Sequence, residues 1–124
     1  MNKQGGFTLI ELVAVLVILA LLGAMAVPRF VDVSNDALVA AQNGSIAAVR
    51  TGHAMAIAEL KTLPRLNQLI NYVGGKNVAV EAGGTGIEVT INGTPYTVGT
   101  YTDTTCTTAT AAATDLVGCV GSIL

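Results

Sequence analysis

The sequence predicts an α+β fold, in which a long N-terminal helix packs against a small antiparallel β-sheet. Apolar and small residues fill the first half of the chain in a helical pattern, and short alternating strand patterns fill the second half. The 124 residues leave room for one domain, and the helix takes up much of that length. Because short strands need a cover for their apolar sides, the helix is the element expected to provide it.

An apolar run from Phe7 to Val27 opens the predicted helix, with Glu11 as its only ionisable side chain. About 21 helical residues at roughly 1.5 Å each span about 30 Å, the thickness of the hydrocarbon core of a bilayer. This length predicts a membrane-spanning helix rather than a buried core helix. Because a lone carboxylate is costly inside a bilayer, Glu11 is expected to have a function and a cationic partner.

The residues before the run differ from those of an ordinary secretory signal. Such a signal is cut after its apolar region, whereas the small pair Gly5-Gly6 lies before the run. A cut after Gly6 would remove residues 1–6 as a leader and keep the hydrophobic helix. It would also release a new α-amino group on Phe7, which is the expected partner of the Glu11 carboxylate.

At these residues the stretch Gly5-Gly6-Phe7-Thr8-Leu9-Ile10-Glu11 resembles the processing site of bacterial type IV pilins and of the pseudopilins of type II secretion. The resemblance implies cleavage after Gly6 by a prepilin peptidase, followed by N-methylation of Phe7. It also implies that Glu11 neutralises the N-terminus of a neighbouring subunit during assembly. The fold that it implies is the pilin fold, a long helix packed on a small sheet.

Pro28 falls where this family has a helix-kinking proline. Pro28-Arg29-Phe30, followed by Asp32 and Asp36, is similar to mannose-sensitive haemagglutinin pilins. A proline has no N–H for the carbonyl four residues earlier and its ring crowds that carbonyl, so a kink is expected there. Gly23 weakens the helix by about a further 1 kcal/mol. The resemblance implies that this segment melts in assembled fibres, and we expect the melting to start near Gly23.

Residues 7–28 are therefore interpreted as the transmembrane and assembly helix, and residues 29–62 as its amphipathic continuation. The end of the helix is expected at Leu63-Pro64, because the residue before a proline is pushed out of the helical region. A rod of this length needs lipid or copies of itself to cover its exposed apolar side. The face expected to pack on the sheet is rich in alanine and comprises Phe30, Val33, Ala37, Ala40, Ala41, Gly44, Ala47 and Ala48.

Residues 63–124 are predicted to form the small sheet. A short amphipathic turn at Leu66–Tyr72 is expected to stop at Gly74-Gly75. Asn92-Gly93 supplies the two positive-φ positions of a type I′ hairpin turn, and the threonine- and alanine-rich tract Thr104–Thr114 is expected to be a loop. The predicted strands are Val78–Val80, Ile87–Ile91, Thr94–Tyr101 and Leu116–Val120.

Cys106 and Cys119 are expected to form one disulfide if this region is extracytoplasmic. Free or metal-binding thiols are the alternative, but two cysteines without a nearby histidine do not make a zinc site. Asp103 and Asp115 flank the cysteine loop and are alternative calcium ligands, although calcium takes about six to eight oxygens. We predict no metal and no cofactor.

The composition excludes two classes of function. The formal net charge is −2 and the charged residues are scattered along the chain, so the sequence has no basic patch for nucleic acid. Tryptophan is absent and other aromatic residues are few, so no surface for base stacking is evident either. His53 is the only histidine and has no recognisable serine or cysteine partner. Since the sequence contains no catalytic triad, paired acids or phosphate-binding glycine loop, the chain is not predicted to be an enzyme.

The sequence thus predicts the structural subunit of a type IV pilus. Its partners would be the prepilin peptidase and N-methyltransferase, an inner-membrane assembly platform, and further copies of itself. The precursor would lie in the inner membrane, and the Phe7 helices would then polymerise into a surface filament for adhesion, motility or DNA uptake. A pseudopilin in a short periplasmic piston is the first alternative, although the disulfide-closed loop resembles pilins more. A monomeric single-span membrane enzyme fits the hydropathy but leaves the Gly6/Phe7 site unexplained.

Overall fold

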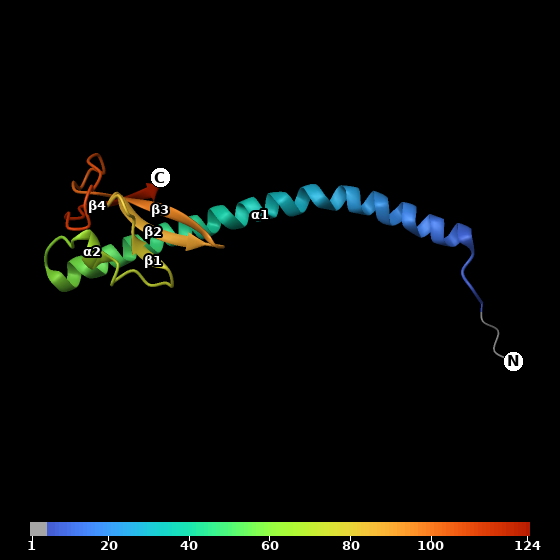
Figure 1. The fold of residues 1–124 in the computed structure, drawn as a ribbon, viewed down its shortest axis with the longest axis horizontal. Helices are drawn as coiled ribbons and strands as arrows, with labels where there is room; N and C mark the ends of the chain where they lie inside the picture. The colour runs from blue at the N-terminus through green and yellow to red at the C-terminus, as the bar shows by residue number, and fades with distance from the viewer. Residues whose placement is uncertain (1–4) are drawn as a thin grey trace. The chain divides into compact units, whose positions relative to one another are not determined.

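The computed structural model describes residues 5–124, and for residues 27–32 it describes the backbone alone. The chain divides into two compact units, Met1–Ala37 and Leu38–Leu124. Helix α1 (Leu9–Leu60) provides the helical part of the first unit and one layer of the second (Figure 1).

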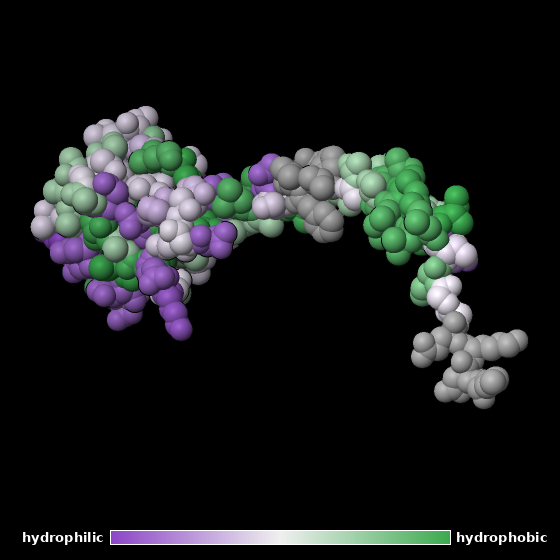
Figure 2. Space-filling view, turned by 45° about the vertical axis from the view of Figure 1, so that its right-hand side comes forward, coloured by the Kyte–Doolittle hydropathy of each residue, from purple (hydrophilic) through white to green (hydrophobic). Residues whose placement is uncertain are grey.

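The first unit presents an uncovered apolar helix. Its stretch Leu9–Ala26 has a mean hydropathy of 2.8, and none of it is buried. By length and composition it can cross a membrane. Figure 2 shows the same stretch as hydrophobic surface, so this unit needs lipid or other helices around it.

The predicted kink concerns Gly23 and Pro28. Gly23 lies exposed on α1, with no atom within 4 Å of the position that a Cβ would take. The side chain of Pro28 lies outside the described residues, as does that of Phe30. The kink therefore stays a prediction.

The second unit contains a four-stranded antiparallel sheet whose strand order follows the chain. The chain forms a short helix, α2 (Leu66–Leu69), before entering the sheet. Asn92 and Gly93 have φ values of 50° and 83°, as the predicted type I′ turn requires, and they join β2 (Gly86–Ile91) to β3 (Thr94–Tyr101). This arrangement confirms the predicted α+β fold. The strands are β1 (Val78–Val80), β2 (Gly86–Ile91), β3 (Thr94–Tyr101) and β4 (Cys119–Ile123).

The core of this unit lies between α1 and the sheet. Val49 and Ala56 of the helix are fully buried, and so are Ile87 and Val98 of the two central strands. Gly52 lies on the same side of the helix, where a Cβ would come within 2.8 Å of the Tyr72 carbonyl oxygen. A glycine is therefore what lets the segment after α2 pass so close to α1. The other buried apolar residues are Leu66, Leu69, Val73, Val89, Val117 and Val120.

The face of α1 that packs on the sheet is not the alanine-rich face predicted from the sequence. Ala40, Gly44 and Ala47 are exposed and Ala48 is half-buried, and nine residues separate Ala40 from the buried Val49. Nine residues are two and a half turns, which places the two on opposite sides of the helix. The face that packs on the sheet instead carries Val49, Gly52 and Ala56, with Ile46 and Leu60 packed beside them.

The start of the last strand also differs from the prediction. The last strand starts at Cys119 instead of Leu116, because Leu116 and Val117 pair with the segment that follows α1. Leu116 forms a bridge with Arg65, and the Val117 N–H donates to the Pro64 carbonyl at 2.8 Å. Helix α1 ends at Leu60, ahead of Leu63-Pro64, and Lys61 directly after it adopts a left-handed conformation with φ 59°.

Candidate processing and assembly site

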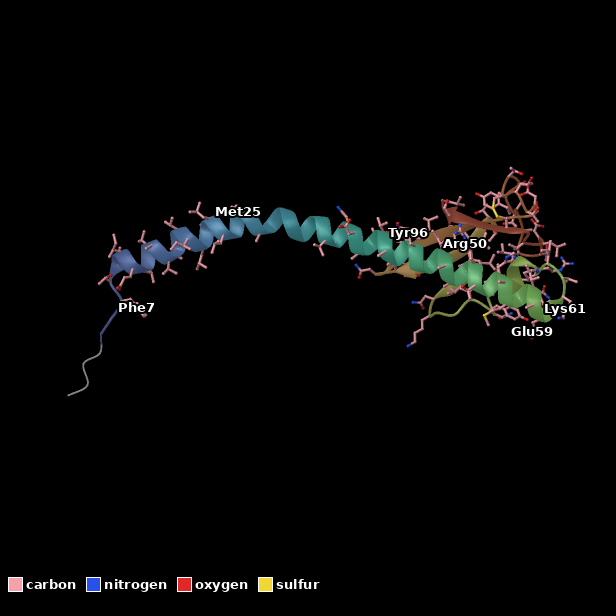
Figure 3. All side chains as sticks on the ribbon, turned by 180° about the vertical axis from the view of Figure 1, so that it is seen from behind. Phe7, Met25, Arg50, Glu59, Lys61 and Tyr96 are labelled. Atoms are coloured by element: carbon pink, nitrogen blue, oxygen red, sulfur yellow. A yellow bond between two sulfur atoms is a disulfide. The ribbon has the colours of Figure 1, made fainter. Side chains whose placement is uncertain are left out.

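The predicted cut site lies in an exposed segment before α1. Residues 5–8 have no regular secondary structure, and the Phe7 side chain is 91% exposed (Figure 3). No atom lies within 4 Å of the position that a Cβ on Gly6 would take. The subunit itself therefore imposes no glycine at this position, and a requirement for one would come from a peptidase that approaches the backbone closely.

Thr8 and Glu11 form a reciprocal cap on the first turn of α1. The Thr8 N–H donates to Glu11 Oε2 at 2.8 Å, and the Glu11 N–H donates to Thr8 Oγ1 at 3.3 Å. This is the capping-box arrangement, which satisfies two backbone donors at a helix start. The interpretation of Glu11 from the sequence missed it, although a threonine three residues before an acid ahead of an apolar run is a recognised signal.

The cap gives Glu11 a structural role within its own helix. A carboxylate near a helix N-terminus is stabilised by the unpaired N–H groups and by the helix dipole. The bond from Thr8 engages one of the two Glu11 oxygens, and a carboxylate has about four acceptor positions in total. Glu11 can therefore hold its local cap and still accept a bond from a second donor.

Phe7 and Glu11 lie at one open hollow of about 470 Å³, together with Leu12 and Val15. The structure thus brings together the two residues predicted to act in assembly. The lining combines one carboxylate with three apolar side chains.

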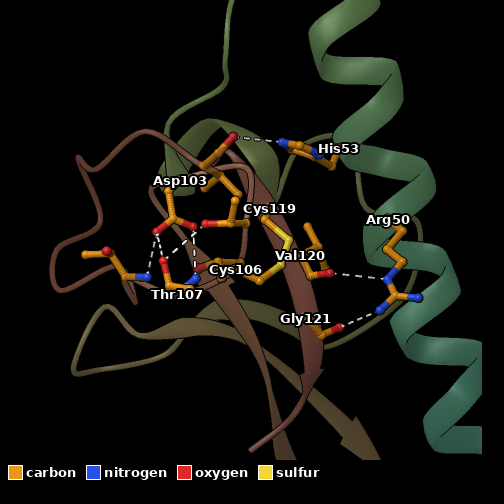
Figure 4. Close-up of a disulfide and its surroundings, with 12 residues drawn as sticks. Arg50, His53, Asp103, Cys106, Thr107, Cys119, Val120 and Gly121 are labelled. Carbon is orange, nitrogen blue, oxygen red and sulfur yellow. Dashed lines mark hydrogen bonds between the residues drawn. A yellow bond between two sulfur atoms is a disulfide. The ribbon is translucent and has the colours of Figure 1, made fainter.

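The predicted disulfide forms a second feature, located in the other unit. Cys106 and Cys119 are bonded, with their Cα atoms 5.4 Å apart (Figure 4). Both are half-buried, and Cys119 is the first residue of β4. This confirms the expected pairing.

Two side chains of α1 hold the end of the loop that the disulfide closes (Figure 4). Arg50 donates to the Val120 carbonyl at 3.3 Å through Nε and to the Gly121 carbonyl at 3.1 Å through Nη2. His53 Nε2 lies 2.8 Å from the Val117 carbonyl. The histidine is thus placed as a structural contact between the helix and this loop.

Asp103 lies before Cys106 and Asp115 lies before Cys119, and each accepts hydrogen bonds from nearby backbone amides. Asp115 Oδ2 accepts from the N–H groups of Ala111 and Ala112, at 2.8 and 3.0 Å. Asp103 accepts from Thr107 and Thr108. Within residues 5–124, no group of three or more His, Cys, Asp or Glu side chains is placed to hold a metal ion.

Comparison with known proteins identifies the N-terminal segment. Residues 1–27 match the model of the prokaryotic N-terminal methylation motif. No solved structure matches the chain significantly.

Three curated relatives match the chain over half of its length or more. The type IV narrow pilus major component PilA5 of Thermus thermophilus is 46% identical over 74 residues, which cover 59% of this chain and 64% of the relative. Fimbrial protein Q of Moraxella bovis is 39% identical over 71 residues, 57% of this chain and 45% of the relative. The type IV major alpha-pilin of the same organism is 40% identical over 62 residues, 50% and 39% respectively.

The matched part thus spans between about two fifths and just under two thirds of each relative's length. None of the three carries a name of the mannose-sensitive haemagglutinin type, and that finer resemblance stays a prediction. The methylation motif and the three relatives confirm that this chain is similar to type IV pilins.

Proposed function

We propose that this chain is the structural subunit of a type IV pilus and catalyses no reaction. The observation that carries the proposal is the N-terminal motif at the start of an exposed apolar helix. Gly6 and Phe7 lie three and two residues before α1, and none of Leu9–Ala26 is buried. An uncovered apolar helix of this length is stable in lipid or inside a bundle of like helices. The names of the relatives describe pilus and fimbrial proteins.

The exposed alanine-rich face of the second unit supports polymerisation. Ala40, Gly44 and Ala47 recur at spacings of four and three on the side of α1 away from the sheet. Small residues at such spacings let two helix backbones approach closely. We infer that the same face of a neighbouring copy covers this surface in the fibre.

Glu11 is proposed to have two successive partners. Before processing, its carboxylate accepts from the Thr8 N–H of its own chain. After cleavage behind Gly6, the methylated amino group of Phe7 from a neighbouring subunit would bind the same carboxylate, a cation in an apolar surrounding. The charge pair would set the axial register of one subunit against the next, because an unpaired charge in that surrounding is costly.

Each segment of the chain is proposed to act at a different stage of processing and assembly. Residues 1–6 are the leader that a prepilin peptidase removes, and residues 7–28 hold the precursor in the inner membrane. An assembly platform in that membrane would then add processed chains to a growing surface filament. Residues 29–62 would line the fibre, and residues 63–124 would form its outer surface.

Electron microscopy of sheared cell-surface material tests the proposal, combined with intact-mass measurement of the fibre protein. Fibres built of a chain that starts at Phe7 are the expected result. If deletion of the chain abolishes protein secretion and no fibres are found, the chain is a pseudopilin. Assembled material that retains residues 1–6 would contradict the assignment.

A further inference from the structure

The hairpin that carries Cys106 is closed by contacts that do not involve sulfur. After β3 the chain turns back on itself, and the hydroxyl groups of Thr100 and Thr110 are buried 2.7 Å apart at the base of this hairpin. The disulfide therefore joins an already paired hairpin to β4. Backbone contacts link Thr100 with Thr110, Tyr101 with Ala109, and Thr102 with Thr108.

The tip of the hairpin is folded around the Asp103 carboxylate (Figure 4). Oδ1 accepts from the Thr107 N–H at 2.9 Å, and Oδ2 accepts from the Thr108 N–H at 2.8 Å and from the Thr107 hydroxyl. These bonds, with that of the Thr107 hydroxyl first, hold the pKa of Asp103 well below its ordinary value. The carboxylate is ionised at neutral pH and spans the turn that contains Cys106.

Cys106 needs this support because of its backbone. Its φ is 56°, in the left-handed region that favours glycine, so the surrounding turn has to hold a cysteine there. In this conformation its Cα lies 5.4 Å from that of Cys119, inside the range of about 4.4–6.8 Å that disulfides require. Cys119 is held separately by its pairing with Tyr101.

We propose that Asp103 is the positioning residue for formation of the Cys106–Cys119 disulfide. Its carboxylate closes the turn before the sulfur bond exists and so presents the Cys106 thiol to Cys119. This inference does not depend on the role of the chain in a fibre.

The oxidation itself needs a disulfide oxidant, for which oxidised glutathione serves as the probe. One protein thiolate attacks glutathione disulfide, forming a mixed disulfide and releasing one glutathione thiolate. The second protein thiolate then attacks the protein sulfur of the mixed disulfide and releases the other glutathione. One S–S bond forms in the protein and one breaks in the oxidant. Two electrons pass to glutathione, and the two thiol protons go to water or to the released thiolates.

The test compares two acids of the same loop in the full chain, purified in detergent micelles. Asp103→Asn keeps the shape of the side chain but replaces an acceptor oxygen by an N–H₂ group, which faces a backbone donor. Asp115→Asn is the matched control, because Asp115 also accepts two backbone N–H groups but bonds Ala111 and Ala112 instead of the Cys106 turn. Each variant is equilibrated in glutathione buffers, and the oxidised fraction is measured by the mass shift on thiol alkylation.

We expect Asp103→Asn to lower the equilibrium constant for oxidation by about 10-fold, as befits the loss of a charge-assisted hydrogen bond. Asp115→Asn should change it less than about 3-fold. Equal losses in both variants would mean a general loosening of the loop and would overturn the proposal, as would no loss in Asp103→Asn.

A second measurement removes the sulfur bond altogether. In the double variant Cys106→Ser and Cys119→Ser, the Thr107 and Thr108 amides should remain protected from hydrogen exchange. Adding Asp103→Asn should then remove that protection. Free exchange of both amides with Asp103 intact would mean that the disulfide forms the turn, and the proposal would be wrong.

Discussion

The backbone N–H of Thr8 donates to the carboxylate of Glu11 at 2.8 Å, so the one acid of the apolar helix has a partner within its own chain. This local bond gives the carboxylate a hydrogen-bond donor without a second chain. It also separates two roles of Glu11, the helix cap and the proposed charge pair with Phe7, which substitutions can distinguish.

We expect Glu11→Val to leave the chain stable in the membrane and to block or greatly slow fibre growth. Valine removes the cost of placing a carboxylate in lipid but also removes the partner of the Phe7 ammonium. Thr8→Ala is the matched control, because it deletes the 3.3 Å bond to the Thr8 hydroxyl and keeps the Glu11 charge. Fibre yield after shearing is the measurement, and normal fibres from Glu11→Val would exclude the charge pair.

Processing should depend on the size of residue 6. Gly6→Leu is expected to leave an uncut precursor in the membrane, since a bulky side chain keeps a peptidase away from the backbone. The side chain meets no atoms of the subunit itself, so folding should be unaffected. Intact mass shows whether residues 1–6 remain, with Gly5→Ala as the control; efficient cleavage of Gly6→Leu would contradict the proposed cut.

Two glycines of α1 should respond to alanine in opposite directions. Gly44 is exposed with open space around it, so Gly44→Ala should stabilise the second unit by about 1 kcal/mol through helix propensity. Gly52→Ala would place a Cβ 2.8 Å from the Tyr72 carbonyl oxygen and should destabilise it by about 1–3 kcal/mol. Urea unfolding of the full chain in detergent, followed by near-ultraviolet circular dichroism, measures both. Stabilisation by both substitutions would contradict the packing described for Gly52.

Removing the disulfide should lower the free energy of unfolding by about 3 kcal/mol in the chain-entropy model. The double variant Cys106→Ser and Cys119→Ser gives this value by urea unfolding, with the reduced unaltered chain as its control. The single variant Cys106→Ser should leave Cys119 reactive to alkylation. Two free thiols in the native unaltered chain would refute the bond.

The segment from Gly23 to Pro28 is expected to unwind in the fibre. Unwinding about six residues from roughly 1.5 to 3.3 Å per residue lengthens the helix by about 10 Å. Neighbouring helices in the fibre can shield the freed backbone groups, whereas a single chain in lipid cannot satisfy them. A fibre reconstruction with unbroken helical hydrogen bonds from Ala20 through Phe30 would exclude the unwinding.

The sequence was sufficient wherever a short-range signal decides the structure. Asn92-Gly93 predicts its turn because two adjacent residues must adopt positive φ. The prediction of the buried face of α1 is wrong. Helical spacing identifies several apolar faces, and contacts with the sheet, which lies far along the sequence, determine which of them is buried. The apolar pattern around Leu116 predicts a strand of the sheet. Its actual partner, Arg65, lies 51 residues earlier, so no local sequence pattern can predict the pairing.

The residues of the candidate sites likewise include some that the sequence predicts and some that it does not. The cut site and Glu11 stand out because their types and spacing are unusual in an apolar run. The cap from Thr8 is also predictable from spacing, because a threonine three residues before an acid at a helix start forms a capping box. The bonds that Asp103 makes around Cys106 depend on the left-handed conformation of Cys106 itself. Cys106 lies in a threonine-rich tract, and the composition of that tract predicts only a loop.

The bonds from Arg50 and His53 to the carbonyl groups around β4 join parts of the chain that are 64 to 71 residues apart. Such distant contacts form late, because the entropy of closing a long loop is lost before the contact forms. A ribosome therefore releases the helix residues well before their carbonyl partners exist. The second unit can complete its folding only after Gly121 has been synthesised. Synthesis and complete folding of this unit are thus sequential, and a chain stalled before Val117 would expose the helix face that these residues cover.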